Sequence, residues 1–475
     1  DNNTAVGHSA LKVNTTGTPN TAVGMCSLHA NTTGADNVAI GYRALKLNTT
    51  TSSNVAVGVN SLASNVASNN TAVGKSTLVD NTTGSNNVAV GKDAMLSNTT
   101  GTCNTAVGMC SMADNTEGDQ NAAFGYFALQ NNTTADFNVA IGGCAMFTNT
   151  TGCHNTALGR NALYANSTGD NNTAIGCGAL DTNTTADNNT AVGMNSLQAN
   201  TTGTCNIAMG VNALTANTTG NNNVAIGFCA NATAHDRNDN TAIGFEALKL
   251  NTAVGNTAVG KAAADSNTTA EGITAIGNRA LCSNTTGANN TAVGMCAMRT
   301  STTGANNTAM GMCSLFANTT GTDNVALGFC ALNANTDTNE NVAIGNFALK
   351  SNDNTNTVGI GFKALCANTT GANNTAVGTN SLDGNTTASD NTAFGKSSLG
   401  ANTTGASNTA IGKDALLTNT TAAENVAVGK QAMQATTTGA GNTSVGTQSL
   451  YTNTEGAQNV AVGLGALFDN TTGSR

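Results

Sequence analysis

A single 17-residue unit repeats along the whole chain, and this repeat limits the fold more than any other feature. Its pattern is Asn-(Thr/Val)-Ala-(Val/Ile)-Gly-x-x-(Ala/Ser)-Leu-x-x-Asn-Thr-Thr-Gly-x-x, and 28 copies fill 475 residues. Of the 27 intervals between the first glycines of the copies, 24 are 17 residues long; Gly58 to Gly74, Gly244 to Gly260 and Gly345 to Gly361 are 16. A fixed period that tolerates one-residue deletions is typical of a solenoid, in which each repeat stacks on its neighbours.

The composition agrees with a thin, repeated core. Aromatic residues make up 3% of the chain, charged residues 9%, and Trp is absent. Such a chain cannot fill a thick globular core, but Val, Ile, Leu and Ala suffice for a narrow one. No composition shift, charge run or Pro-rich linker interrupts the repeat. We therefore expect residues 1–475 to form a single continuous solenoid domain.

The residues before the first glycine of each unit predict a strand. The residue just before this glycine is apolar in all 28 copies, and the residue two positions earlier is Thr or Val in most, as in Val38 and Ile40. This spacing of β-branched residues predicts a strand whose Thr/Val and Val/Ile side chains are buried. Leu or Met lies four residues after the glycine in 26 copies, which suggests a second short strand. The Asn-Thr-Thr-Gly segment that follows predicts a turn.

One such unit is too small to be stable alone, so the units must stack. The predicted fold is all-β: a parallel β-solenoid, or β-roll, of about 28 coils with 17 residues per coil. At a strand separation of ~4.8 Å, these coils would form a rod roughly 130 Å long. Asn occupies the position four before the glycine in 26 of the 28 copies. Stacked identical amides predict a hydrogen-bonded ladder.

A uniform Ala separates the two β-branched strand positions. It is present in 26 copies, and only Gly359 and Ser444 depart from it. By strand alternation, we expect this Ala to point away from the buried Thr/Val face. Three explanations for its small size stay open: close approach of the opposite side of a flattened coil, close approach of a neighbouring subunit, or packing needs within one coil.

The strand motif resembles a known family of surface proteins. The sequences at 86–91 (Asn-Asn-Val-Ala-Val-Gly), 222–227 (Asn-Asn-Val-Ala-Ile-Gly) and 36–41 (Asp-Asn-Val-Ala-Ile-Gly) resemble the head repeats of YadA-like trimeric autotransporter adhesins. Related arrays occur in viral and microbial surface fibres. The resemblance implies a left-handed β-roll, three chains side by side, and display outside the cell. The present unit is longer than the usual head repeat, because it carries the added Asn-Thr-Thr-Gly loop.

The expected partners follow from the repeat and from the resemblance. We expect copies of this chain, packed laterally or joined head to tail because the sequence starts and stops inside the repeat, and also glycans of a host or surface. The net charge of −9 and the lack of a basic stripe argue against nucleic acid. No segment reaches the ~20 apolar residues of a membrane helix.

The His, Cys and Asn residues are the candidates for metal sites, disulfides and glycosylation. The four His are dispersed and paired Cys-x-x-Cys motifs are absent, so neither a zinc site nor any cofactor is expected. The 13 Cys are interpreted mainly as small apolar fillers, with occasional disulfides as the alternative. Asn-Thr-Thr occurs 18 times and each copy is formally an N-glycosylation sequon; the candidate sites include Asn14, Asn31, Asn48, Asn81 and Asn98. Turn formation alone also explains these tripeptides.

Three classes of function compete. The leading hypothesis is an extracellular structural or adhesive fibre on a cell or virion surface, whose function lies in length, rigidity and a repeated surface. The second is binding of ice or another crystalline surface by an outward array of Asn and Thr. An enzyme is not expected, because Asp and Glu are thinly spread and form no paired catalytic arrangement.

Overall fold

The computed structural model describes residues 2–474, and every regular element in this range is a β-strand. The contacts between residues divide the chain into two compact units, Asp1–Asn240 (unit 1) and Thr241–Arg475 (unit 2). Both units are built from the same coil. The expectation of one continuous domain stays a prediction.

Unit 1 contains the first 14 strands. They are β1 (Thr4–Val6), β2 (Asn20–Val23), β3 (Asn37–Ile40), β4 (Val55–Val57), β5 (Thr71–Val73), β6 (Val88–Val90), β7 (Thr105–Val107), β8 (Ala122–Phe124), β9 (Val139–Ile141), β10 (Thr156–Leu158), β11 (Thr173–Ile175), β12 (Thr190–Val192), β13 (Ile207–Met209) and β14 (Val224–Ile226).

Unit 2 contains the other 14 strands. They are β15 (Thr241–Ile243), β16 (Thr257–Val259), β17 (Thr274–Ile276), β18 (Thr291–Val293), β19 (Thr308–Met310), β20 (Val325–Leu327), β21 (Val342–Ile344), β22 (Val358–Ile360), β23 (Thr375–Val377), β24 (Thr392–Phe394), β25 (Thr409–Ile411), β26 (Val426–Val428), β27 (Thr443–Val445) and β28 (Val460–Val462).

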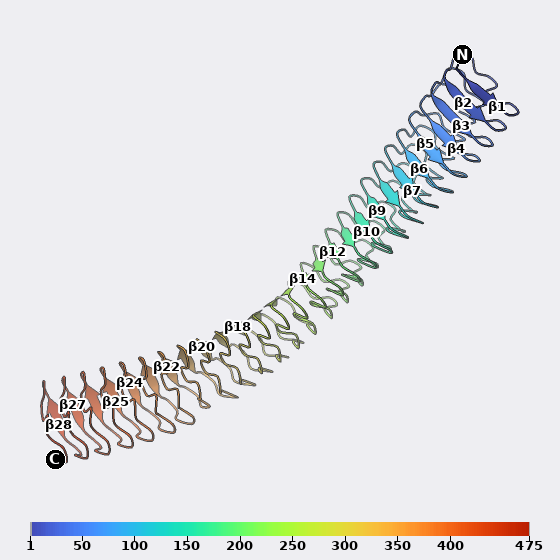
Figure 1. The fold of residues 1–475 in the computed structure, drawn as a ribbon. Helices are drawn as coiled ribbons and strands as arrows, with labels where there is room; N and C mark the ends of the chain where they lie inside the picture. The colour runs from blue at the N-terminus through green and yellow to red at the C-terminus, as the bar shows by residue number, and fades with distance from the viewer. Residues whose placement is uncertain (1, 475) are drawn as a thin grey trace. The chain divides into compact units, whose positions relative to one another are not determined.

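Within each unit, every strand pairs in parallel with the strand of the next coil. Thr173 of β11 lies opposite Thr190 of β12 in unit 1, and Thr274 of β17 lies opposite Thr291 of β18 in unit 2. In Figure 1 the strands of each unit follow one another as consecutive rungs. The fold is therefore a parallel β-solenoid with about 17 residues per turn, as the repeat predicts.

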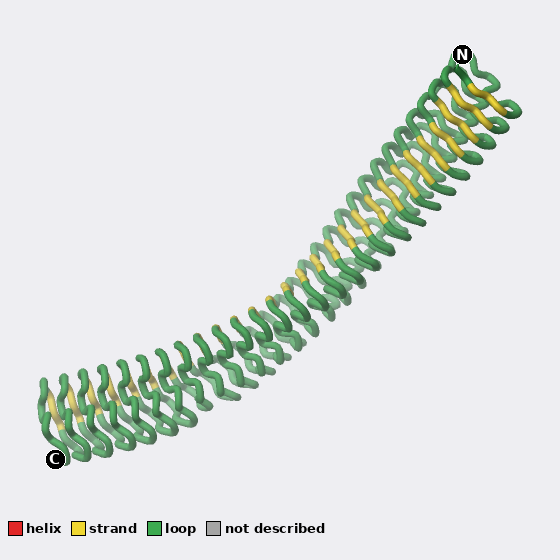
Figure 2. The backbone as a smooth tube through the Cα atoms, viewed as in Figure 1, coloured by secondary structure: helices red, strands yellow, loops and turns green. Residues whose placement is uncertain are grey.

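The prediction of a second strand is wrong. Each coil has one strand, and the rest of the coil is loop and turn (Figure 2). Leu28 has a φ of 48° and Cys26 a φ of 57°, which is the left-handed region and incompatible with an extended strand. Hydrogen bonds between coils nevertheless continue through this turn: the N–H of Cys26 donates to the carbonyl of His8, and the N–H of Leu28 to that of Ala44, both at 2.9 Å.

The prediction for the buried face of the strand is also wrong: the face expected to be buried points outward, and the face expected to point outward is buried. The central Ala of the strand is completely buried, as at Ala22 and Ala39, whereas the flanking Thr, Val and Ile side chains are half-buried or exposed. Alternation defines two faces of a strand, but it does not say which one is inside.

Close approach of the opposite side of the coil accounts for the small residue. The central strand position faces the buried Leu of the preceding repeat: a Cβ on Gly359 would come 2.9 Å from Cγ of Leu349, which lies four residues after Gly345. The coil is narrow, so only a small residue fits at this position: Ala in 26 copies, Gly at Gly359 and Ser at Ser444. Contact with a neighbouring subunit is not needed to explain the uniform Ala.

The predicted asparagine ladder is confirmed, and a second one lies beside it. In the strand Asn column, which contains Asn20, Asn37 and their equivalents, the N–H of Asn37 donates to Oδ1 of Asn20 at 3.0 Å. The turn Asn column contains the Asn that begins each Asn-Thr-Thr segment. In this column, Nδ2 of Asn48 donates to Oδ1 of Asn31 at 3.1 Å. The two columns satisfy polar groups that would otherwise be buried without a partner.

The 16-residue repeats lose their residue in the turn. In a regular coil, Nδ2 of Asn81 donates to the carbonyl of Gly84, three residues on, at 2.9 Å. In a short coil, Nδ2 of Asn65 donates to the carbonyl of Ala67, only two residues on, at 2.7 Å. The turn Asn keeps its hydrogen bond, so the deletion does not disturb the strand register.

The strand glycine, which is the first glycine of each unit, makes the corner after the strand. Gly176 has a φ of 131°, and a Cβ there would lie 2.6 Å from the carbonyl oxygen of Gly193 in the next coil. Both the conformation and the close approach of the backbones require glycine.

Candidate interaction surface

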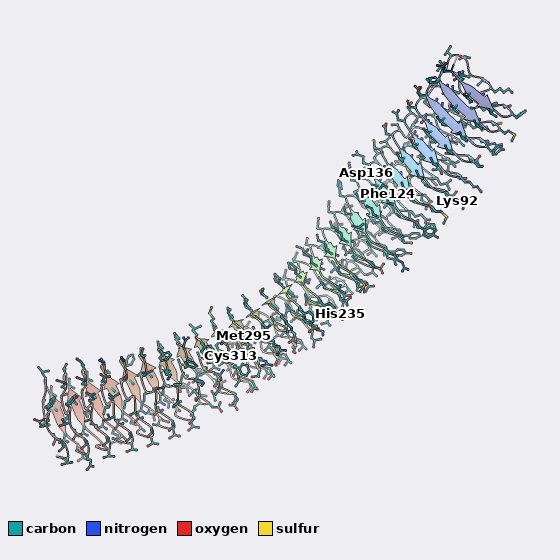
Figure 3. The ribbon with its side chains drawn as sticks, in the orientation of Figure 1. Lys92, Phe124, Asp136, His235, Met295 and Cys313 are labelled. Atoms are coloured by element: carbon teal, nitrogen blue, oxygen red, sulfur yellow. The ribbon has the colours of Figure 1, made fainter. Side chains whose placement is uncertain are left out.

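The outward side of the strands is a surface of uniform character in each unit. We call it the strand face: the side chain just before each strand glycine and the side chain two positions earlier, on every strand from β1 to β28. Ile40 is 39% exposed, Phe124 40% and Met310 46%, and none of the strand-face residues is charged. Figure 3 labels Phe124 on the ribbon of β8.

The parallel register arranges the strand face as two columns in each unit. One column is Thr or Val in most coils, and the other is Val, Ile, Leu, Met or Phe. Five successive strands of unit 2, β15 to β19, carry Thr at the first position. Because like side chains repeat at one strand spacing of ~4.8 Å, the surface has the regularity of the backbone ladder beneath it.

Charged side chains lie beside the strand face, in the two variable positions after the strand glycine. Lys92 contacts Asp93 at 3.0 Å and Lys413 contacts Asp414 at 3.6 Å. The hydrogen bond that Lys92 donates to the carboxylate of Asp93 raises the pKa of Lys92. The lysines of both ion pairs are exposed and the aspartates half-buried, and ion pairs at the surface contribute little to stability. They nevertheless border the apolar columns with polar groups.

The candidate glycosylation sites lie mainly in the interior. Asn31, Asn48, Asn81 and Asn98 are completely buried in the turn Asn column. Nδ2, the atom that carries an N-linked glycan, donates two hydrogen bonds in each of these four residues. Asn14 is half-buried, and its Nδ2 donates to the carbonyl of Gly17 at 3.0 Å. Glycosylation remains a prediction, but on the folded coil it would displace these bonds.

The structure also changes the basis of the ice-binding hypothesis. That hypothesis places both Asn and Thr on an outward array, but the strand Asn column is buried. Only the Thr side chains of the strand face point outward. The hypothesis itself stays untested.

Other candidate features are small or dispersed. A shallow hollow of about 240 Å³ in unit 1 is lined by Arg43, Lys46 and Asn60 among others. This is below the ~300 Å³ at which ligand pockets begin. All 13 cysteines are free thiols, and in residues 2–474 no three or more His, Cys, Asp or Glu side chains are placed to hold one metal ion together. The same residues contain no helix of the length and apolar character that crossing a bilayer requires.

The comparisons with known proteins give no family. No protein-family model matches the sequence, and no curated protein matches it.

Sequence reasoning identified the strand-face residues but assigned them to the core. The signal that distinguishes the two faces is the uniformity of the central Ala. A position that is Ala in 26 of 28 coils is restricted by tight packing, whereas the strand-face positions vary in size from Ala to Phe.

Proposed function

We propose that this chain is part of an extracellular structural fibre on a cell or virion surface, in which copies of the chain pack side by side through the strand face. The observation that carries this proposal is the strand face itself. In each unit, the 14 strands present uncharged, mostly apolar side chains outward in two in-register columns.

The size of the strand face supports a stable contact between copies. Each unit has 14 strands with two outward side chains apiece, and all of the described ones are half-buried or exposed. A stable interface buries ~800 Å² per partner with roughly 20 to 30 residues a side, and each unit offers 28 outward side chains. Exposed apolar patches of this size mark interaction sites.

The regularity of the surface favours a second copy of the same chain as the partner. Another copy presents the same columns at the same spacing, so contacts made by one coil recur at the next. A globular partner without this period would match only a few coils. The resemblance of the strand motif to YadA-like head repeats supports the same proposal, including a trimer, a left-handed roll and a role in attachment.

The proposal is tested by adding charge to the strand face. One variant carries lysine at three strand-face positions of unit 2: Ile276→Lys, Met310→Lys and Val445→Lys. The control carries lysine two residues later in the same coils: Asn278→Lys, Met312→Lys and Thr447→Lys. Lysine occurs naturally at this control position, for example at Lys261 and Lys396, so the coil tolerates it.

We expect the unmodified chain and the control to sediment as a multiple of 47.0 kDa, and the strand-face variant to sediment as a single chain with an unchanged circular dichroism spectrum. Buried lysines that face a second apolar surface cost several kcal/mol in total, since each must lose its hydration. A monomeric unmodified chain at high concentration, or an equally associated strand-face variant, would contradict the proposal.

A further inference from the structure

Three cysteines form a column on the surface of unit 2. Cys296, Cys313 and Cys330 each lie two residues after a strand glycine, in three consecutive coils. The N–H of Cys313 donates to the carbonyl of Met295 at 3.0 Å, and that of Cys330 to the carbonyl of Met312 at 3.1 Å. The cysteines are therefore stacked in register. Their φ angles of 57°, 55° and 52° show that the backbones are also oriented alike.

This arrangement does not recur at the other cysteines in the same position of the coil. Cys26, Cys110, Cys144 and Cys229 have other residue types at the equivalent position of the coils before and after them; Cys229, for example, lies between Asn212 and Glu246. The chain thus contains isolated thiols that match the column in backbone position but lack a thiol neighbour.

The surroundings of the column are rich in sulfur. The residue before Cys296 is Met295, which is 49% exposed, and the residue before Cys313 is Met312, which is 40% exposed. Figure 3 labels Met295 and Cys313, which belong to successive coils. All three thiols are half-buried, and burial is the main cause that raises the pKa of Cys313, with Cys330 and Cys296 adding to it.

The spacing of the coils favours a bridging ion over a disulfide. Stacked residues with the same backbone orientation place their Cβ atoms about one strand spacing, ~4.8 Å, apart, whereas disulfides hold them at ~3.8 Å. A disulfide would therefore pull two coils together by ~1 Å against the backbone ladder. Two metal–thiolate bonds of ~2.3 Å in line span ~4.6 Å, which fits the undistorted coils.

We propose that this column binds a soft monovalent d¹⁰ ion, Cu(I) or Ag(I), in two-coordinate fashion between the sulfurs of adjacent coils. Thiolate and thioether ligands are those that select such ions. Binding of the first ion releases two thiol protons to solvent. A second ion at the other pair releases only one more, because Cys313 is already a thiolate, and neither step transfers an electron. The sulfur of Cys313 is common to both pairs, and the thioethers of Met295 and Met312 are available as additional weak ligands.

The test uses the full chain with reduced thiols in oxygen-free buffer and Ag(I) as the probe, because Ag(I) does not oxidise thiols. After addition of one or two equivalents, the remaining thiols are alkylated and each cysteine is quantified by peptide mass spectrometry. We expect Cys296, Cys313 and Cys330 to lose their reactivity while Cys229 keeps it.

Two variants complete the test. Cys313→Ser leaves Cys296 and Cys330 two coils apart, ~9.6 Å, which is too far for one bridging ion. We therefore expect it to abolish the protection of both. Serine occurs at the same position and φ in Ser9 and Ser76, so this variant keeps the native backbone. Cys229→Ser is the matched control and should leave the protection unchanged.

Equal protection of Cys229, or protection of Cys296 and Cys330 that survives in Cys313→Ser, would overturn the proposal. So would rapid formation of a disulfide between Cys296 and Cys313 with oxidised glutathione in the folded chain, because the coils would then approach more closely than the bridging geometry assumes.

Discussion

Asn20 and Asn31 donate hydrogen bonds to the same acceptor, the carbonyl oxygen of Gly34. Nδ2 of Asn20 lies 2.8 Å from this oxygen and Nδ2 of Asn31 lies 3.0 Å from it. The three residues belong to one repeat, so the shared carbonyl joins the strand Asn to the turn Asn and closes the coil. Each amide also bonds to a neighbouring coil, Asn20 to Asn37 and Asn31 to Asn14. Both Asn positions are therefore restricted within and between coils.

Removal of a strand Asn should loosen the coil that follows it. In Asn172→Ala the N–H of Asn189 loses its acceptor, Oδ1 of Asn172, which lies 3.0 Å away. An unsatisfied buried N–H costs about 1 to 3 kcal/mol. We expect a corresponding fall in hydrogen-exchange protection at Asn189 and Thr190. The control is Asn171→Ser, at a position where Ser53 has the same left-handed backbone. Unchanged protection in Asn172→Ala would show that the ladder contributes little.

The strand glycines should differ in their tolerance of alanine according to whether a coil lies above them. Gly176 and Gly463 have similar φ angles of 131° and 127°, so alanine strains both by about 1 to 3 kcal/mol. A Cβ on Gly176 would meet the carbonyl oxygen of Gly193 at 2.6 Å, whereas the nearest atom to a Cβ on Gly463 is 3.9 Å away.

Gly176→Ala should therefore destabilise the solenoid about twice as much as Gly463→Ala, since overpacking adds about 1 to 3 kcal/mol. Urea unfolding followed by circular dichroism measures the difference. If both variants lose the same free energy, backbone strain alone explains the glycine column.

The sequence predicted the solenoid because its evidence is periodic. Glycine at a fixed interval defined the coil, the three 16-residue intervals showed that the period tolerates deletions as a solenoid does, and Asn at a fixed position predicted the ladder. Each of these inferences needs only that like residues stack on like.

Periodicity alone could not predict which face of the strand is buried. The pattern of Thr21, Ala22 and Val23 is compatible with either face inward, and hydrophobicity favoured the wrong one. The deciding quantity is the width of the coil. Leu28 enters from a left-handed turn and occupies the interior, which leaves room only for Ala opposite it. Neither the left-handed turn nor the width is visible in the sequence, because Leu rarely adopts positive φ.

One of the two exceptions in the buried Leu position, Asn231, should be open to a stabilising substitution. Asn231 occupies this position and is completely buried, and neither Nδ2 nor Oδ1 has a hydrogen-bond partner. Asn231→Leu removes two unsatisfied polar atoms and buries an apolar side chain. Each gain is about 1 to 3 kcal/mol. Together they exceed the cost of ~1 kcal/mol that arises because Leu tolerates the left-handed backbone less well than Asn does.

We expect a net stabilisation of about 2 kcal/mol or more in urea unfolding of Asn231→Leu. Asn212→Leu is the control, because Asn212 also has a left-handed backbone but is not fully buried. It should be neutral or destabilising. If the two variants behave alike, the interior at Asn231 contains a partner for the amide.

Secreted, folded protein should carry no glycan at the buried sequons. Nδ2 of Asn81 donates to Oδ1 of Asn65 at 2.6 Å and to the carbonyl of Gly84 at 2.9 Å, and a glycan would remove at least one of these bonds. Peptide mass spectrometry of the soluble fraction from a glycosylating host should find Asn81 and Asn98 unmodified. Asn14, which is half-buried, is the site where modification would first be tolerated. An occupied Asn81 in folded protein would contradict the buried ladder.

Three Asp carboxyl groups, which occupy the same position in three different coils, should make the solenoid more stable in acid than at neutral pH. Burial raises the pKa of Asp181, Asp265 and Asp383, each five residues after a strand glycine. The folded state therefore binds their protons more tightly than the unfolded state does, so stability falls as pH rises from the ordinary Asp value of 3.8 through the raised values.

Replacement of all three with Asn should raise the urea midpoint at pH 7 and leave it nearly unchanged at pH 3, where the carboxyl groups are protonated in both states. The exposed Asp36→Asn is the control, and Asn86 shows that Asn fits this position. A triple variant that is less stable than the original chain at pH 7 would contradict this prediction. It would mean that favourable contacts of the ionised carboxylates outweigh the cost of their desolvation.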